Sequence, residues 1–379
     1  MWTRQNEWSR ASGWMPGALE PSPECQLALL FAGKDVLASG DALDDVRRAY
    51  PAAHVIGCST AGEIRDVNVS DDTLVVTAVC FERSRVRAAG VDLGAATDSR
   101  QAGVELARAL AGDDLVHVFV LSDGLGVNGS ELVAGLAAEL PAHVTTSGGL
   151  SGDGDRFEET LVLLDEPRAR SGLVAAVGLY GSSLRVGCAS LGGWDPFGPE
   201  RVVTRSEGNV LHELDGRSAL GLYREYLGEH AADLPASGLL FPLTVRTPDH
   251  DVPVVRTVLA IDDENQTMTF AGDLPEGAYA RLMKANFDRL IDGAGDAART
   301  SSEALANHQP DLAILISCVG RKMVLKQRVE EELEAVRSVV GPYATLAGFY
   351  SYGEISPFTP NARCELHNQT MTITAISEL

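Results

Sequence analysis

Three short segments combine two glycines with a carboxylate at a fixed spacing. They are Gly57–Glu63, Gly149–Asp155 and Gly348–Glu354, and each reads Gly-x-x-x-x-Gly followed by Glu or Asp. Glycine permits a sharp backbone turn and close approach by another group. A carboxylate beside exposed backbone amides suits a ligand that is zwitterionic or carries an amine. Alternatively, these acids only cap helices or fix turns.

Phosphate-binding loops share this glycine spacing but differ in the residues that follow. A P-loop requires Lys and then Ser or Thr after its second glycine. Glu63, Asp155 and Glu354 occupy that position, where their negative charge would repel a phosphate. A Gly-x-Gly-x-x-Gly dinucleotide loop is also absent after any predicted first strand. The loops are therefore not expected to bind nucleotides in either of these ways.

Side chains in the loops carry groups that contact ligands or react with substrates. A thiol and two hydroxyls follow a predicted strand at Cys58, Ser59 and Thr60, which admits an enzyme with Cys58 or Ser59 as nucleophile. The sequence places no base beside them, so we interpret Cys58 as a small loop residue and keep catalysis as an alternative. The loop residues predicted to bind a ligand are Cys58, Ser59, Thr60, Glu63, Ser151, Asp153, Tyr350, Tyr352 and Glu354.

Arg321 follows the predicted strand that begins the third of these regions. An arginine just beyond the carboxyl end of a parallel strand is well placed to bind a ligand carboxylate through two hydrogen bonds. A salt bridge to a neighbouring unit is the alternative. Tyr350 and Tyr352 flank Ser351, so in an extended loop both rings point to one side and form a pocket wall, or else they pack in the core.

The histidines show no metal-binding spacing. The chain has eight, at positions 54, 117, 143, 212, 230, 250, 308 and 367, and none forms an i, i+4 pair or a His-x-His motif. A single histidine can nevertheless bind haem without a covalent attachment. We therefore predict no metal site and keep haem as an alternative cofactor.

Composition and charge narrow the class of protein. The 379 residues are 45% hydrophobic and 22% charged, as in globular proteins, and the net charge is −22. Such a charge disfavours nucleic acid and anionic membranes as partners. Six cysteines without a C-x-x-C pair indicate buried thiols in a reducing compartment. We find no secretion signal or membrane-spanning run, so we expect a cytoplasmic location.

Three stretches repeat the order strand, helix, strand, each leading into a glycine loop. They run from Leu27 to Gly57, from Val116 to Gly149 and from Leu312 to Gly348. Connections of this length predict parallel strand pairs with right-handed crossovers. Alternating β-branched runs after each loop predict antiparallel strands, and residues 205–295 are interpreted as a degenerate fourth unit.

The predicted fold is α/β, with two related halves built from duplicated strand–helix–strand units. Mixed sheets are flanked by helices in a layered αββα-like arrangement. We place an irregular arm at residues 1–24, which holds Trp2, Trp8 and Trp14, a first domain at 25–200 and a second at 201–379. The boundary lies in a segment rich in glycine and proline.

Two of the loops, with their flanks, resemble the FIST family of bacterial sensory proteins. The segments that carry the resemblance are Gly57–Ile64 and Gly348–Pro357, supported by Ser147–Gly154, Glu213–Gly216, Leu222–Gly228, Ser317–Arg321 and His367–Ala375. The similarity extends from about Gln26 to the C-terminus and includes the N-terminal and C-terminal FIST halves. The two loops in this order are its most specific feature.

The resemblance implies a sensory protein that binds a small molecule such as an amino acid. Members of the family occur fused to, or encoded beside, histidine kinases, chemotaxis receptors and cyclic-di-GMP enzymes, and some bind haem and respond to nitric oxide. No kinase or cyclase sequence is present here, so we expect signalling to a separate partner. The alternatives are a haem-binding nitric-oxide sensor and an enzyme that uses Cys58 or Ser59.

Overall fold

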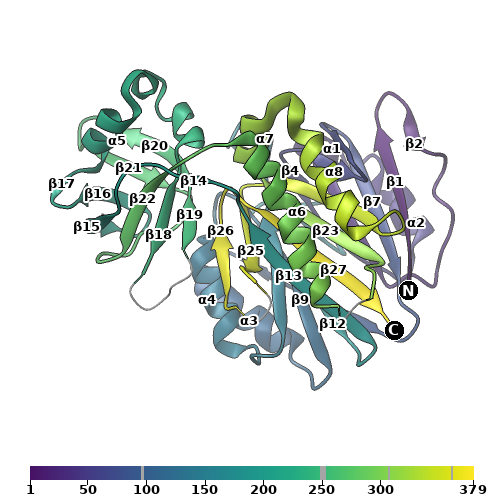
Figure 1. Ribbon diagram of the computed structural model, residues 1–379. Coiled ribbons are helices and arrows are strands. Elements are labelled where there is room, and N and C mark those ends of the chain that lie inside the picture. The colour runs from purple at the N-terminus through teal and green to yellow at the C-terminus, as the bar shows by residue number, and fades with distance from the viewer. Residues whose placement is uncertain (95–97, 248–252, 306–307, 360–361) are drawn as a thin grey trace.

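The chain forms a mixed α/β fold with four sheets. A computed structural model describes residues 1–94, 98–247, 253–305, 308–359 and 362–379. Three six-stranded sheets, flanked by helices, form the body, and a fourth, antiparallel sheet lies to one side of it (Figure 1). The predicted α/β class with mixed sheets flanked by helices is therefore confirmed.

Each sheet of the body is built on one predicted strand–helix–strand unit. The first consists of β3 (Leu27–Gly33), α1 (Lys34–Ser39), α2 (Leu43–Ala49) and β4 (His54–Thr60). The second consists of β9 (Leu115–Ser122), α4 (Gly129–Glu139) and β10 (Thr145–Leu150). The third consists of β23 (Leu312–Cys318), α7 (Val319–Leu325), η3 (Lys326–Arg328), α8 (Val329–Val340) and β24 (Thr345–Ser351). The two strands of every unit pair in parallel, as predicted.

Further strands complete the three sheets in matching order. The first sheet is β11 (Val162–Leu164), β4, β3, β7 (Leu74–Cys80), β1 (Trp2–Ser9) and β2 (Gly13–Met15). The second is β26 (Cys364–His367), β25 (Gly353–Pro357), β10, β9, β12 (Leu173–Tyr180) and β8 (Arg85–Asp92). The third is β13 (Leu184–Leu191), β27 (Met371–Glu378), β23, β24, β5 (Glu63–Arg65) and β6 (Asn68–Ser70).

The strand that follows each glycine loop joins the sheet of another unit. Strand β5 leaves the first unit and pairs with β24 of the third, while β11 leaves the second and pairs with β4 of the first. Strand β25 leaves the third and pairs with β10 of the second, which closes the cycle. The glycine loops are therefore the crossing points between the sheets, and the exchange links segments on both sides of residue 200.

Alternate residues of the central strands enter different cores. Phe31, Phe119 and Ile316 belong to one buried cluster shared by the three sheets, in which the rings of Phe31 and Phe349 lie 4.7 Å apart. Leu315, from the opposite face of β23, packs in the layer under the helices. There α3 (Ser99–Leu110) packs on α4, and α6 (Phe287–Glu303) packs on α8. The three sheets thus form one folded body.

The region predicted to hold a fourth unit forms a separate antiparallel domain, defined here as residues 195–284. Its predicted strands and helix are present, but its strand pairs are antiparallel among the described residues. Connections of a few residues, such as the one between β20 and β21, permit only antiparallel pairing. Its elements are β14 (Asp195–Pro196), β15 (Arg201–Glu207), β16 (Val210–Leu214), β17 (Arg217–Ser218), α5 (Ala219–Leu227), η1 (Gly228–Asp233), η2 (Ala236–Leu240), β18 (Leu243–Arg246), β19 (Val254–Arg256), β20 (Val258–Asp262), β21 (Thr267–Phe270) and β22 (Tyr279–Lys284).

The N-terminal arm is not irregular, contrary to the prediction. Strand β1 pairs with β7 from Trp2↔Cys80 to Trp8↔Leu74, and β2 extends the sheet as a hairpin. Its sequence, WTRQNEWS, has many polar residues because most of the strand is half exposed, so local composition concealed the strand.

Two of the six cysteines are not free thiols. Cys25 and Cys80 form a disulfide, whereas Cys58, Cys188, Cys318 and Cys364 are free. The antiparallel pairing of β3 with β7 places Leu27 opposite Val79, and this brings Cys25 and Cys80 together over a separation of 55 residues. The expectation of buried thiols alone is therefore wrong for this pair.

Candidate functional site

Three adjoining cavities, together called the cleft, lie where the first strands of the three units end. Gly33 ends β3, Gly124 follows β9 and Cys318 ends β23, and each lines one of three adjoining cavities. Their volumes are about 540, 440 and 330 Å³. The carboxyl ends of parallel strands commonly bind ligands because loops and helix starts converge there. The antiparallel domain contributes Leu239, Leu259 and other residues to the opposite wall.

The 440 Å³ cavity is lined mainly by apolar side chains. Four large apolar residues of its wall are exposed to solvent. The exposed fractions are 44% for Leu125, 43% for Phe157, 44% for Leu259 and 38% for Met323. Only ten large apolar residues are exposed in the described part of the chain, so their gathering in one cavity is not typical of surface composition. Exposed apolar patches on soluble proteins usually bind something.

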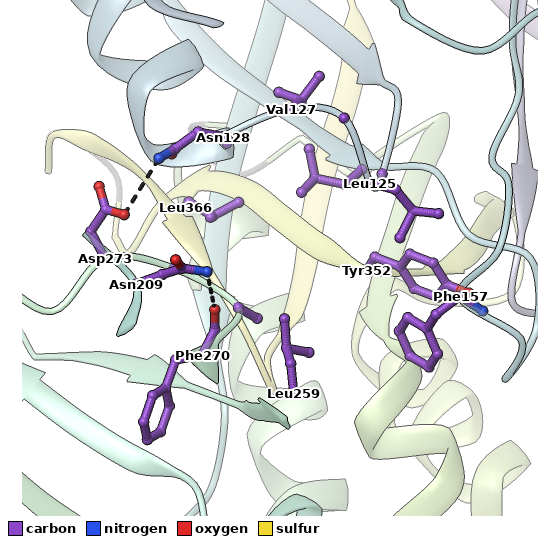
Figure 2. A pocket seen from close by; sticks show the side chains of 16 residues that line it. Leu125, Val127, Asn128, Phe157, Asn209, Leu259, Phe270, Asp273, Tyr352 and Leu366 are labelled. Atoms are coloured by element: carbon purple, nitrogen blue, oxygen red, sulfur yellow. Dashed lines mark hydrogen bonds between the residues drawn. The ribbon is translucent and has the colours of Figure 1, made fainter. Parts of the chain in front are cut away.

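Tyr352 forms the aromatic wall of this cleft together with Phe157. The two rings stack with centroids 4.3 Å apart, and Figure 2 shows them beside Leu125 and Leu259. The Tyr352 hydroxyl donates a hydrogen bond to the Asp153 carboxylate. The backbone amides of Phe157, Glu158 and Glu159 donate to the same carboxylate, at 2.9, 2.9 and 3.0 Å. Asp153 therefore fixes the loop that presents Phe157.

Hydrogen bonding has a larger effect than burial on the pKa of the Asp153 carboxyl. Burial alone would raise the pKa of this carboxyl, but the Tyr352 hydroxyl and the backbone amides lower it below its ordinary value. The carboxylate is thus ionised at neutral pH and acts as a fixed acceptor, while Tyr352 keeps its proton because burial and Asp153 raise its pKa.

The 540 Å³ cavity adjoins the apolar one and carries charges of both signs. It shares Val319 and Met323 with its neighbour. Lys322 donates to the carbonyl of Ala61 at 2.9 Å and pairs with Asp71. The charged residues of this wall are Lys34, Asp35, Glu63, Asp71, Asp72, Asp153, Asp155, Arg156, Lys322 and Lys326. A ligand with both an ammonium and a carboxylate group would find partners for each.

Two predicted carboxylates, Glu63 and Glu354, are buried and bonded within the fold. Glu63 accepts from Thr60 and from the amide and hydroxyl of Thr73, at 3.0 and 2.8 Å for Thr73. Glu354 makes the same set of contacts with Ser351 and Thr370, at 2.8 to 3.2 Å. Burial raises the pKa of Glu63 to about 7 and that of Glu354 to about 8. Each ties its glycine loop to the start of an antiparallel strand.

The second loop departs from this pattern. In the first and third loops a Cβ added at Gly57 or Gly348 would lie 2.4 or 1.8 Å from a carbonyl oxygen of the adjacent strand. The residue with this environment in the second unit is Gly148, at 1.9 Å from the Val120 oxygen, not Gly149. The equivalent glycine is thus one residue earlier than the spacing predicts, and Asp155 is exposed.

Four other predicted residues also use their side chains inside the protein. Ser59 accepts from the amide of Leu161 at 2.8 Å, and Ser151 donates to the carbonyl of Ser122 at 2.8 Å. Tyr350 donates to Glu332 at 2.7 Å. Cys58 is fully buried, and burial raises its thiol pKa, which weakens it as a nucleophile.

Arg321 is fully buried and forms a salt bridge with Glu332 of its own unit. Its Nη2 lies 2.8 Å from the Glu332 carboxylate, which is also fully buried. Its remaining hydrogen bonds go to backbone carbonyls. The guanidinium donors are therefore used inside the protein, as in the salt-bridge alternative, and do not face a ligand in the cleft. Of the ten predicted residues, Tyr352 lines the apolar cavity, and Thr60, Glu63 and Asp153 line the polar one.

No histidine lines the three cavities of the cleft among the described residues. Burial lowers the pKa of His117 to about 3 and of His367 to about 4, and both rings hydrogen-bond within the fold. Within the described ranges no group of three or more His, Cys, Asp or Glu side chains is arranged for a metal. The cleft therefore does not fit haem through an axial histidine. None of the described helices is long and apolar enough to span a membrane.

The sequence did not identify the apolar half of the site. Leu125 lies between two glycines, Phe157 between Arg156 and Glu158, and Met323 beside charged Lys322. A large apolar residue in a polar or glycine-rich surrounding is the one signal that would have drawn attention to them. Leu259 carried no such signal, because it reads as an ordinary strand residue.

Comparisons with known proteins identify two family domains along the chain, and the boundary between them falls inside the antiparallel domain. The FIST N domain matches residues 26–217, and the FIST C domain matches residues 219–357. The uncharacterized protein MJ1623 of Methanocaldococcus jannaschii is 23% identical over 77% of this chain, and the uncharacterized protein Rv0628c of Mycobacterium tuberculosis is 27% identical over 63%. The alignments span only 59% and 62% of those relatives' lengths.

A solved structure also resembles the chain over most of its length. The crystal structure of a chorismatase aligns with 99% of this chain and 98% of its own, at 11% identity and a TM-score of 0.35. A score of this size carries no inference about chemistry.

Proposed function

Because this chain belongs to the FIST family, whose domains are associated with sensing and signal transduction, we propose that it is a sensor for a small zwitterionic ligand with an aromatic side chain. An aromatic amino acid is the simplest example. The observation that carries the proposal is the junction of an apolar cavity with a cavity that holds both signs of charge.

The two cavities match the two ends of such a molecule. An aromatic ring would stack in the cavity beside Phe157 and Tyr352 and bury Leu259 and Met323. The shared wall at Val319 would bring its ammonium and carboxylate groups into the charged cavity. There Lys322 and Lys326 are partners for a carboxylate, and the aspartates Asp71 and Asp155 are partners for an ammonium.

We infer that ligand binding is signalled to a separate partner, such as a histidine kinase or a cyclic-di-GMP enzyme. We also infer that the protein is located in the cytoplasm. The family association supports the partner class. The acidic net charge of −22 supports a protein, not nucleic acid, as that partner. Bacterial two-hybrid or pull-down assays with the kinases of the source organism test this part.

Calorimetry with L-phenylalanine tests the ligand class. Phenylalanine should bind, and 3-phenylpropionate and 2-phenylethylamine, which each lack one charge, should bind roughly tenfold or more weakly, because a charged side chain then stays unpaired. Phe157→Ala should weaken phenylalanine binding by roughly tenfold through loss of stacking.

Tyr343→Ala is the matched control, since Tyr343 is an aromatic residue that is 94% exposed and lines none of the three cavities of the cleft. It should bind phenylalanine as the wild type does. Equal losses in Phe157→Ala and Tyr343→Ala, or no heat from any aromatic amino acid, would contradict the proposal.

A further inference from the structure

The two connections between the body and the antiparallel domain meet at one buried side chain. The chain enters the domain through Gly192–Trp194. It leaves the domain through a second connection, defined here as Ala285–Leu290, which includes the first turn of α6. The Nη1 of Arg321 donates to the carbonyl of Gly192 at 2.6 Å, and its Nη2 donates to the carbonyl of Leu290 at 2.7 Å. One guanidinium thus holds both connections.

The two connections also touch each other closely. Gly193 has a φ of +86°, and a Cβ there would lie 1.9 Å from the carbonyl oxygen of Arg289. The side-chain amide of Asn286 donates to Asp195 at 3.0 Å. Entry and exit therefore cross at one place, which is the geometry of a hinge.

Helix α7 lies between this crossing and the cleft. Val319, Gly320 and Met323 line the apolar cavity, and Lys322 lines the charged one. From the same short helix, Val324 and Leu325 pack with Trp194 and Leu290 of the two connections and with Met283 of β22. Arg321 is anchored from behind by Glu332, which also accepts from Tyr350 and Ser317. A shift of α7 would therefore be transmitted directly to both connections.

Away from the crossing, few polar contacts hold the domain to the body among the described residues. One of them joins the side-chain amide of Gln369 to the carbonyl of Leu239 at 3.4 Å. Arg256 donates to the carbonyl of Leu366 at 2.9 Å, and Asn128 donates to Asp273 at 3.4 Å, as drawn in Figure 2. The apolar side chains on the two walls remain exposed: Leu259 on the domain and Leu125 on the body are each 44% exposed. Closure of the domain over the cleft would bury both of them.

We propose that Arg321 is the pivot of a hinge, and that α7 couples occupancy of the cleft to closure of the antiparallel domain. Arg321 is a positioning residue in this scheme and does not contact the ligand. The inference rests on the proposed function for the cleft and adds the movement by which binding is passed on. It also gives a reason for a guanidinium at a position where the sequence had predicted a ligand contact.

Distances between paired spin labels, measured by double electron–electron resonance on the full chain, test the hinge. One pair, Glu264→Cys with Tyr343→Cys, joins exposed sites on the domain and the body. The control pair, Ala138→Cys with Tyr343→Cys, joins two exposed sites of the body. Saturating L-phenylalanine should shorten or narrow the first distance distribution and leave the second unchanged.

Arg321→Lys keeps the charge but loses the fork that reaches both carbonyls. This variant should abolish the ligand-induced shift while phenylalanine still binds in calorimetry. If Arg321→Lys is not folded by circular dichroism, Trp194→Phe replaces it. It removes the 2.8 Å bond from the indole to the Gln369 carbonyl, together with part of the packing of the indole in the cluster that joins the connections to α7. This change at the first connection should reduce the shift.

Different results would overturn the hinge proposal and the sensor proposal. Binding of phenylalanine in calorimetry with unchanged domain-to-body distances would overturn the hinge and leave the sensor intact. If phenylalanine does not bind, the sensor proposal fails, and the unliganded protein still decides the hinge. A narrow distribution that is the same in wild type and Arg321→Lys would then overturn it, whereas a broad one that Arg321→Lys changes would support it.

Discussion

The second glycine loop differs from the first and third in the role of its side chains. In the first and third, Glu63 and Glu354 are buried and make matching bonds to a Thr at the start of an antiparallel strand. In the second, Asp155 is exposed, and the loop continues to Phe157 in the wall of the cleft. The copies that keep the motif bind their carboxylates within the fold, whereas the copy that departs from it presents an exposed aromatic ring in the cleft, opposite Tyr352 of the third loop.

This difference cautions against treating a repeated motif as a binding motif. The repeated carboxylate is satisfied by the protein's own donors, so it has little left to offer a ligand. The divergent loop instead leaves an aromatic side chain exposed, with a φ of +56° at Phe157. A non-glycine residue in this conformation is held there by its surroundings, here the hydrogen bond that its amide donates to Asp153 and the stacking of its ring on Tyr352.

The largest effect is expected from the glycine that defines the register of the second loop. Gly148→Ala should lower the free energy of unfolding by at least ~4 kcal/mol or prevent folding, because its Cβ would overlap the Val120 carbonyl. Gly154→Ala is the comparison: it has open space around it, so only its φ of +76° is unfavourable, at about 1 kcal/mol. Urea denaturation measures both. Similar values for the two would mean that the equivalent glycine has been misplaced.

A smaller loss is expected from removing a buried carboxylate. Glu354→Ala leaves the amide and hydroxyl of Thr370 and the hydroxyl of Ser351 without their acceptor, which should cost roughly 3 kcal/mol of unfolding free energy. Asp155→Ala removes an exposed carboxylate and should change it by less than about 0.5 kcal/mol. Denaturant midpoints compare the variants. A loss at Asp155 as large as that at Glu354 would remove the distinction between the loops.

Local patterns predicted the elements well, and long-range pairing limited the rest. The strand–helix–strand units, such as Leu27–Gly33 with His54–Thr60, follow from apolar runs and connection lengths that lie close together in the sequence. The exchange of β5 into the third sheet does not, because a three-residue strand pairs with β24, which lies about 280 residues later. No periodic pattern in the sequence encodes such a partner.

The site was half predictable for the same reason. Tyr352 and Asp153 could be found because they belong to a recurrent loop. Arg321 was correctly placed at the end of β23, but which way its side chain points depends on Glu332 and Gly192, which lie 11 and 129 residues away. Leu259 enters the cleft only because the antiparallel domain folds against the body. Such residues depend on tertiary structure, which the sequence pattern does not record.

The smallest effect, taken per pH unit, is the change in the free energy of unfolding that the two buried glutamates produce as pH changes. Their pKa values in the folded protein, about 7 for Glu63 and about 8 for Glu354, lie above the ordinary value of 4.5. Between about pH 5 and pH 8 these two carboxyls therefore hold protons in the folded state that they lose in the unfolded state, and their contribution to stability falls as pH rises. His117 and His367, whose pKa values are lowered, contribute in the opposite direction below about pH 6.5. Each carboxyl contributes at most about 1.4 kcal/mol per pH unit to that slope.

Glu354→Gln should flatten this dependence, since the amide has no proton to lose. Urea denaturation at pH 5, 6, 7 and 8 should give a difference from wild type that shrinks or reverses in favour of the variant as pH rises. Asp155→Asn is the control, because an exposed carboxylate should leave the slope unchanged. If Glu354→Gln does not alter the slope, the Glu354 carboxylate is already ionised in the folded protein at these pH values. The buried Glu354 and the exposed Asp155 would then differ in burial but not in proton affinity.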